Sequence, residues 1–313
     1  MDCEVRHVGR LGSMMSMSTS SVAYRSLRGG PRTNLADLVP LPAPFTVYLE
    51  PTNICNFKCS YCPVHFDDYA ERSGGLSRLT LEDCTRVFRD ILALGRLRTL
   101  NLYMLGEPFA NKRLPEFISL AKQLDVADRV IVTTNATLID EAMARRTIES
   151  RLDYLRVSIY GTSNSRSAQV TGSKIPLNRI VANVTRLKSI RDERGSAWPH
   201  IYVKMIDAGD AEDNKRFLEL FGPISDQAAV EPAMNWNLPK DEVNLSGPHE
   251  NLDAEHFRHK KTACPFPFYS LVVNADLRVT VCCVDWEKAP RSATCVIRRF
   301  SRSGTARRFA IFA

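Results

Sequence analysis

Residues 45–62 read FTVYLEPTNICNFKCSYC and hold the features that set both fold and chemistry. The first six residues alternate in polarity and include β-branched and aromatic types, so they predict a β-strand. Three cysteines follow at once, Cys55, Cys59 and Cys62, in a segment that reads as a loop. The stretch therefore predicts a strand whose carboxyl end carries three thiols.

Strand and helix patterns alternate outward from this stretch. Further strands are expected at 99–105, 129–134, 154–160, 200–206 and 228–232, and helices from the capping box at 80–83 and at 114–124, 139–150, 175–191 and 211–221. Nearly continuous apolar strands separated by helices are typical of a parallel sheet with helices outside. The pattern predicts an α/β fold, either a partial or complete barrel or an open doubly wound sheet.

Composition bounds the class of protein. The chain has 313 residues, 44% hydrophobic and 25% charged, which is ordinary for a folded globular protein. Its net charge of +7 is concentrated at the ends, and from Arg291 onward six arginines occur without an acidic residue. The basic tail would suit a nucleic-acid modifier, but no basic motif interleaved with aromatic residues accompanies it, so we expect no nucleic-acid partner. With neither an apolar run long enough to span a membrane nor an N-terminal secretory signal, the expected location is the cytoplasm, away from membranes.

Four segments are expected along the chain. Residues 1–42 read as a flexible extension, 43–236 as the α/β core, 237–262 as a linker, and 263–313 as a compact cysteine-containing segment. In the last segment, 268–273 and 279–284 predict two strands of a hairpin that turns at 274–276. The basic tail beyond it loses periodicity, which suggests a truncated or altered reading frame.

Six of the nine cysteines lie in two groups, at 55–62 and at 264–283, which favours metal ligation over a disulfide framework. The spacing from Cys55 to Cys62 suits three thiolates on three irons of a cubane, which leaves the fourth iron open to a substrate or cosubstrate. A structural zinc site is the alternative, and it would need a fourth ligand such as His65.

The string CNFKCSYCP, with Tyr61 before the last cysteine, closely resembles the motif of the radical S-adenosylmethionine (SAM) superfamily. The resemblance implies an enzyme with a partial (β/α)6 TIM-like barrel, in which Cys55, Cys59 and Cys62 hold a 4Fe-4S cluster. SAM would chelate the open iron and be cleaved to a 5'-deoxyadenosyl radical that abstracts hydrogen from the substrate. It also implies an electron donor such as flavodoxin or ferredoxin.

Polar residues at later strand ends resemble the family's SAM-binding positions. Gly106, Glu107 and Pro108 match its second motif, in which the glycine allows close backbone approach and the carboxylate meets the methionine ammonium. Thr134, Asn135 and Ser158 resemble the residues for the ribose and the methionine carboxylate, with helix capping or an Asx turn as the alternative reading. Lys204 is read as a solvated charge and is left outside the site.

The C-terminal segment resembles the SPASM or twitch extension that binds auxiliary 4Fe-4S clusters. Cys264 and Cys282 match its first ligands, with buried thiols under a hairpin as the alternative. Only Cys283 and Cys295 follow, where the family usually supplies a longer cysteine series. We therefore expect one cluster, and a second only if the tail still builds its site.

The substrate stays open between two classes. One is a small polyol, aminocyclitol or nucleotide sugar that is oxidised after hydrogen abstraction, and the other is a peptide or protein that a SPASM-type maturase modifies. A zinc-stabilised or degenerate protein without activity is the non-enzymatic alternative. Candidate substrate-binding residues at the mouth of the barrel are Tyr103, Tyr160, Glu231 and Trp236.

Overall fold

The computed structural model describes residues 34–207, 209–231, 264–280 and 282–288. All of them belong to one compact unit of the chain. The expectations for the first 33 residues, the linker at 237–262, Trp236 and Cys295 lie outside the described residues.

One sheet of eight strands organises the described residues. Its strands are β1 (Thr46–Leu49), β2 (Leu97–Asn101), β3 (Ala127–Thr134), β4 (Tyr154–Ile159), β5 (His200–Ile206), β6 (Gln227–Glu231), β7 (Ser270–Val273) and β8 (Val279–Thr280). They are arranged in the order β6-β5-β4-β3-β2-β1-β7-β8. Strands β1 to β6 are neighbours in chain order and pair in parallel. This confirms the predicted (β/α)6 arrangement, since parallel neighbours need a crossover between them.

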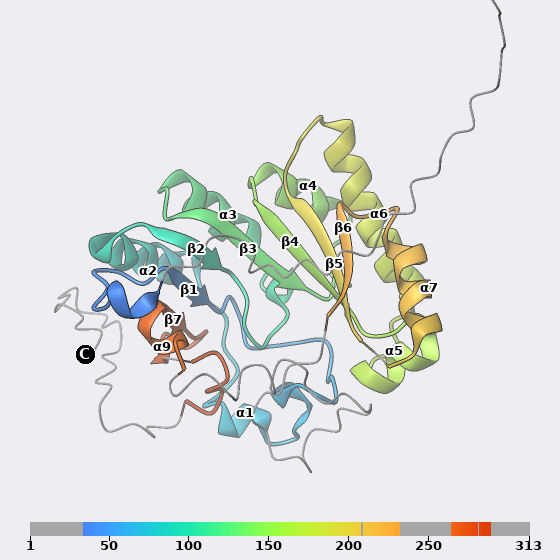
Figure 1. Cartoon of the computed structure of the whole chain (residues 1–313), viewed down its shortest axis with the longest axis horizontal. Coiled ribbons are helices and arrows are strands. Elements are labelled where there is room, and N and C mark those ends of the chain that lie inside the picture. Colours follow the sequence, from blue (N-terminus) through green and yellow to red (C-terminus); the bar gives the residue numbers. More distant parts are fainter. Residues whose placement is uncertain (1–33, 208, 232–263, 281, 289–313) are drawn as a thin grey trace, which may run out of the picture. The chain divides into compact units, whose positions relative to one another are not determined.

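Helices cover one side of this sheet (Figure 1). The α-helices are α1 (Tyr69–Arg72), α2 (Leu81–Leu94), α3 (Leu114–Gln123), α4 (Glu141–Glu149), α5 (Asn164–Thr171), α6 (Leu177–Glu193), α7 (Ala211–Phe221) and α9 (Phe266–Tyr269), and the 3-10 helices are η1 (Leu35–Asp37), η2 (Pro63–His65) and η3 (Pro108–Ala110). The predicted capping box is present at the start of α2, where Thr80 and Asp83 satisfy each other's backbone N–H groups.

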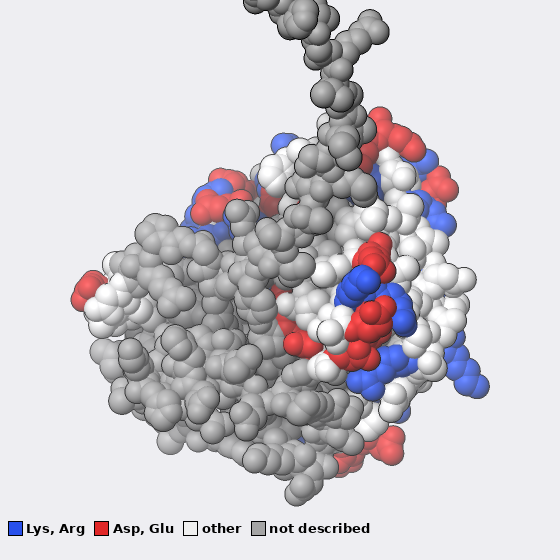
Figure 2. All heavy atoms as spheres, turned by 45° about the vertical axis from the view of Figure 1, so that its right-hand side comes forward, with Lys and Arg blue, Asp and Glu red and all other residues white. Residues whose placement is uncertain are grey.

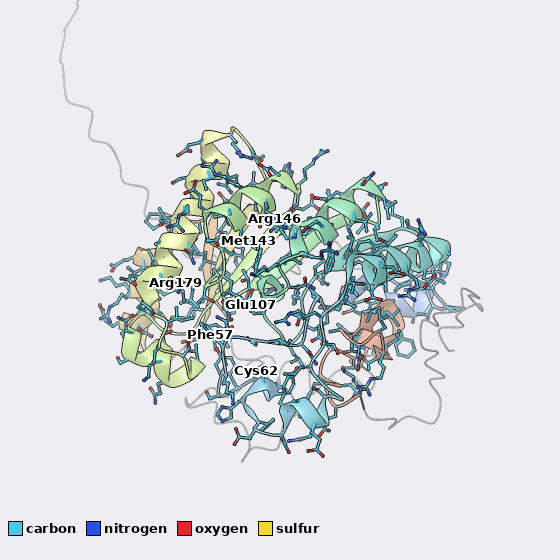
Figure 3. All side chains as sticks on the ribbon, turned by 180° about the vertical axis from the view of Figure 1, so that it is seen from behind. Phe57, Cys62, Glu107, Met143, Arg146 and Arg179 are labelled. Carbon is cyan, nitrogen blue, oxygen red and sulfur yellow. The ribbon has the colours of Figure 1, made fainter. Side chains whose placement is uncertain are left out.

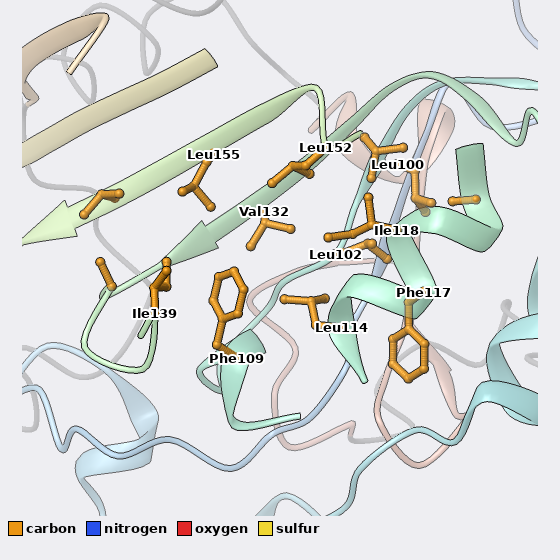
Figure 4. Packing of buried hydrophobic residues seen from close by; sticks show 14 of the residues in the cluster. Leu100, Leu102, Phe109, Leu114, Phe117, Ile118, Val132, Ile139, Leu152 and Leu155 are labelled. Atoms are coloured by element: carbon orange, nitrogen blue, oxygen red, sulfur yellow. The ribbon is translucent and has the colours of Figure 1, made fainter. Parts of the chain in front are cut away.

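The hydrophobic core lies between the sheet and these helices. Alternate strand residues such as Leu100, Val132 and Leu155 are fully buried against Phe117 and Ile118 of α3 and their neighbours (Figure 4). Each such side chain contributes roughly 1.5–3 kcal/mol when it leaves water. The intervening strand residues face the other side of the sheet, which is the inner face of the partial barrel.

Three local predictions need correction. Strand β2 ends at Asn101, not at residue 105, because the chain turns toward the site beyond it. Helix α5 was not predicted, since its buried residues are Ser167 and Thr171 and form no apolar stripe. The segment before β7 begins as helix α9, with Pro267 in its first turn, where proline is well tolerated.

The C-terminal hairpin joins the barrel sheet. Strand β7 pairs in parallel with β1, and β8 pairs antiparallel with β7. The turn forms where predicted, and Leu277 adopts the left-handed φ of 66° that such turns usually give to glycine. The hairpin is therefore an extension of the same sheet.

On the face in Figure 2, the visible acidic and basic side chains lie interspersed. No described helix is long and apolar enough to cross a bilayer.

Candidate functional site

The cysteine loop follows β1 and ends at η2. Its backbone is fixed from below by α5, because Lys58 N–H donates to the Thr171 carbonyl (2.8 Å) and Ser60 N–H to the Val170 carbonyl (2.9 Å). Cys62 N–H closes the turn on the Cys59 carbonyl at 2.9 Å. The three thiols therefore sit on a loop with a defined backbone.

These three thiols are unpaired and largely removed from solvent. Burial raises the pKa of Cys62 to about 11, and burial together with the Glu107 charge raises that of Cys55 to about 12. Burial and the other two sulfurs also raise the pKa of Cys59. Thiolates would be costly here without a positive centre, so the chemistry of this donor set fits a metal group that supplies one.

A single metal ion is not well matched to this loop. Among the described residues, no three Cys, His, Asp or Glu side chains converge closely enough to hold one ion. His65, the fourth ligand that zinc would need, is exposed and its Nδ1 lies 3.4 Å from the Lys58 carbonyl oxygen. A cubane places each thiolate on a different iron and so requires no such convergence.

The Gly106-Glu107-Pro108 motif lies against the residues just before Cys55. A Cβ atom at position 106 would collide with the Thr52 carbonyl oxygen, and Glu107 N–H donates to the Ile54 carbonyl at 3.0 Å. The predicted close approach exists, but the chain's own backbone occupies it. Pro108 is buried and opens η3, where its missing N–H costs nothing.

Glu107 is 2% exposed, and its carboxylate faces the strand ends. Its Oε1 accepts hydrogen bonds from Thr134 Oγ1 (2.6 Å) and Phe109 N–H (3.1 Å), and its Oε2 accepts one from Asn135 N–H (2.8 Å). Burial raises its pKa to about 7 despite these donors. Because a carboxylate has about four acceptor positions, one remains for a further donor. Figure 3 shows Glu107 beside the segment that carries Phe57 and Cys62.

A chain of side-chain hydrogen bonds ties the end of β3 to the cysteine loop. Asn135 Nδ2 donates to Asn56 Oδ1 (2.9 Å), and Asn56 Nδ2 donates to Thr137 Oγ1 (2.8 Å). Asn135 Oδ1 accepts from both the backbone N–H and the hydroxyl of Thr137. Thr134 and Asn135 thus hold Glu107 and the loop in place. The sequence reading missed Asn56 and Thr137, although the polar run after the strand signalled the second.

Aromatic rings flank Cys59. Tyr160 packs on Tyr61 with ring centroids 5.8 Å apart and on Phe57 at 5.9 Å. Burial is the largest cause of the raised pKa of Cys59, and the neighbouring Tyr160 side chain lowers that pKa slightly. Tyr61 therefore packs beside the cysteine loop. Tyr160, which was expected near the substrate, packs there as well.

Ser158 and Lys204 are opposite each other on β4 and β5 on the inner face. Lys204 Nζ donates to Glu231 Oε2 (2.8 Å), and the Tyr202 hydroxyl donates to Glu231 Oε1 (2.7 Å). Burial lowers the pKa of Lys204. Lys204 is therefore a paired, half-buried cation, which corrects its reading as a solvated charge. Deeper on the same face, Arg156 donates to the Tyr103 hydroxyl at 3.4 Å.

The profile of the radical SAM superfamily matches residues 49–196, the segment that carries the cysteine loop, Glu107 and Ser158. Residues 49–196 of this chain are a radical SAM domain. Members of this enzyme superfamily use a 4Fe-4S cluster and SAM.

Several curated proteins are similar to part of this radical SAM chain. Fe-coproporphyrin III synthase of Methanosarcina barkeri is 32% identical over 35% of this chain and 26% of its own length. PqqA peptide cyclase of Granulibacter bethesdensis is 28% identical over 56% of this chain and 43% of its own length. GTP 3',8-cyclase of Stenotrophomonas maltophilia is 26% identical over 52% and 56%. The chain thus spans between a quarter and somewhat over half the length of these relatives.

Solved radical SAM structures share the fold. SuiB of Streptococcus suis, solved with the precursor peptide SuiA, superposes with a TM-score of 0.61 at 11% identity, covering 86% of this chain and 66% of that one. The enzyme anSMEcpe, solved with AdoMet, gives 0.51 at 15% identity over 77% and 75%. At these identities the likeness shows the fold alone.

The second cysteine group of this radical SAM chain is built differently from the first. Cys264 is exposed, and Cys282 and Cys283 are partly buried neighbours. A hydrogen bond from Cys283 lowers the pKa of Cys282 to about 6 and raises that of Cys283. Of the predicted auxiliary ligands, Cys264 lies before the hairpin and Cys282 lies after it. Their ligation of a cluster stays a prediction.

Proposed function

We propose that this chain cleaves SAM reductively at a 4Fe-4S cluster held by Cys55, Cys59 and Cys62, and uses the product to abstract hydrogen from a substrate. The observation that supports this most is the set of three unpaired thiols, one buried and two partly buried, on a loop that Glu107 and Asn135 fix in place. When bound, the cluster supplies the electron that breaks the sulfonium C5'–S bond, which yields methionine and the 5'-deoxyadenosyl radical.

The chain's own residues would bind and orient SAM. Glu107 offers its remaining acceptor position to the methionine ammonium, and its burial strengthens such a charge-assisted bond. Ser158 offers a hydroxyl on the inner face to the carboxylate, while Thr134 and Asn135 line the ribose side. Tyr61, Gly106 and Pro108 shape the loop backbone around these groups.

We propose that the substrate binds on the inner face of the barrel, next to Tyr103, Tyr160 and Glu231. The hydroxyls and charges on this face suit a small molecule rich in hydroxyl groups, such as a polyol, an aminocyclitol or a nucleotide sugar, which the enzyme would oxidise. A peptide substrate is the second candidate, favoured by the 28% identity to PqqA peptide cyclase.

The remaining assignments follow from the same chemistry. Residues 43–236 would form the radical SAM core, with an extension at 1–42, a linker at 237–262 and a partial SPASM- or twitch-like segment at 263–313. A flavodoxin or ferredoxin would supply the electron. A reducing compartment keeps thiols available for iron, which supports a location in the cytoplasm.

The test is cleavage of SAM by anaerobically reconstituted protein with dithionite as reductant. We expect 5'-deoxyadenosine from the wild-type protein and from Cys84→Ala, whose thiol is buried in α2 and outside the site. The triple replacement of Cys55, Cys59 and Cys62 by Ala should form none. A wild-type protein that binds zinc and leaves SAM intact would instead support the non-enzymatic alternative.

A further inference from the structure

A second, small apolar cluster lies apart from the main core. Its buried members are Val64, Tyr69 and Trp286, and the partly buried residues packed on it are Cys55, Cys62, Phe66 and Leu105. Trp286 is 5% exposed and comes from the C-terminal segment. Two of the three site cysteines therefore pack on the cluster to which this tryptophan belongs.

Trp286 is held by ring contacts and a cation. Its ring stacks on Phe66 at 5.9 Å and an interplanar angle of 24°, and lies 5.8 Å from Tyr69. The Arg72 guanidinium lies over Trp286 (4.6 Å) and over Phe66 (5.0 Å). Arg72 also pairs with Glu287 at 2.9 Å, so the residue next to the tryptophan is held by the same arginine.

The C-terminal segment is attached to the cysteine side of the barrel at further points. Glu50, 2% exposed, accepts hydrogen bonds from Ala275 N–H (3.1 Å) and from Leu105 N–H (3.2 Å). Arg278 donates to the Ser73 carbonyl at 2.9 Å. Together with the β1–β7 pairing, these bonds fix the direction from which Trp286 reaches the loop.

We propose that Trp286 is a positioning residue that covers the Cys55 and Cys62 side of the cysteine loop and keeps water and dioxygen from it. The inference rests on the proposed function, namely that these cysteines hold the 4Fe-4S cluster. Trp286 is absent from the main core and belongs to the small cluster on which Cys55 and Cys62 pack. Removal of the indole would expose the apolar side chains beside Cys62 to solvent.

The consequence is a change in the cluster's surroundings more than in the fold. Hydrogen bonding and solvent exposure around a cluster set its reduction potential and its lability. Water beside the site stabilises the more negatively charged, reduced cluster. Loss of Trp286 should therefore shift the potential to less negative values and speed oxidative loss of iron.

The test compares reconstituted wild-type protein with Trp286→Ala and Trp286→Phe. The matched control is Trp198→Ala, because Trp198 is 51% exposed and lies before β5. We measure iron content, the rate at which the absorbance near 400 nm bleaches in air, the reduction potential and the unfolding midpoint. Trp286→Ala should bleach about ten times faster and show a less negative potential, while Trp286→Phe and Trp198→Ala stay near wild type.

Bleaching and potential of Trp286→Ala that equal those of the wild type would overturn the proposal. An equal change in Trp198→Ala would do the same. If Trp286→Ala does not fold, Glu287→Gln, which weakens the contact with Arg72, should show the same changes to a smaller extent, and their absence would also overturn it. Failure of the wild-type protein to bind iron would instead count against the proposed function itself.

Discussion

Asp226 and Asp153, at the amino end of the strands, differ from Glu107, at the carboxyl end, in what compensates their carboxylates. At the amino end, Asp226 before β6 pairs with Arg191 through both oxygens and also accepts from Ile201 N–H. Asp153 before β4 pairs in the same manner with Lys122 at 2.7 and 2.8 Å. At the carboxyl end, Glu107 accepts hydrogen bonds from neutral donors alone among the described residues.

The difference distinguishes carboxylates that stabilise the fold from the one that we propose binds SAM. The carboxylates at the amino end are neutralised by cations from the helices, and they fasten helix to sheet. Glu107 is held in place with its charge uncompensated, so an incoming ammonium gains more from it than from a carboxylate that is already paired. Active sites of α/β barrels lie at the carboxyl end of the strands, and the electrostatics of this chain follow that rule.

The largest effect that tests the comparison is on stability at the amino end. Asp226→Asn should lower the free energy of unfolding by about 3 kcal/mol, because Arg191 stays buried with a weaker partner. Denaturant melts measure this. SAM cleavage per folded molecule should stay at the wild-type level. A loss of cleavage larger than the loss of folded protein would contradict the view that Asp226 contributes to stability alone.

The next largest effect concerns SAM affinity at the carboxyl end. Glu107→Gln removes the charge offered to the methionine ammonium and should weaken SAM binding by about 2 kcal/mol, or roughly thirtyfold. Calorimetry on the reconstituted protein measures it. Glu116→Gln in α3, a partly exposed glutamate paired with Arg146, is the control and should bind SAM normally. Equal affinities in both variants would remove Glu107 from the site.

A smaller effect should appear in the pH dependence of stability, with opposite signs at the two ends. The pKa of Glu107 is raised from 4.5 to about 7, so its contribution is present below pH 4.5 and is lost as pH rises to about 7. The pKa of Asp226 is lowered from 3.8, so its contribution is present above pH 3.8 and is lost as pH falls through its lower folded value. Melts of Glu107→Gln should lose the first dependence, and those of Asp226→Asn the second. The same profile in both variants would contradict this assignment.

The smallest expected effect is at Ser158. Ser158→Ala should reduce SAM affinity by about 1 kcal/mol, or fivefold, since one neutral hydrogen bond is lost. Thr133→Val, at the neighbouring inner-face position of β3, serves as the control because its hydroxyl is buried without a partner among the described residues. An unchanged affinity in Ser158→Ala would mean that β4 contributes nothing to SAM binding.

Local sequence patterns predicted most of the sheet and its helices. Strands β1 to β6 were found because apolar residues run along them, and α2 because its capping box and apolar stripe are both local signals. Helix α5 has neither signal, as Ser167 and Thr171 are what it buries. The cysteine loop was found through the spacing of Cys55, Cys59 and Cys62. This spacing is set by the metal group that the thiolates bind and can be recognised without knowing the fold.

The contacts that hold the site in place could not be predicted from the sequence, because they join residues that are far apart along the chain. Glu50 resembles an exposed acid after a strand, yet it meets the backbone of Ala275, 225 positions away. Trp286 and Phe66 likewise become neighbours only through the β1–β7 pairing. At Gly106 a Cβ atom would meet the Thr52 carbonyl oxygen, and this neighbour is evident only in three dimensions.

The iron and acid-labile sulfide content of anaerobically reconstituted protein tests the central claim most directly. We predict about four irons per wild-type chain, and none at this site after Cys55, Cys59 and Cys62 are replaced by Ala. About eight irons would show that the Cys264 and Cys282 group builds a second cluster as well. Zinc in place of iron, or full iron content in the triple variant, would contradict the account.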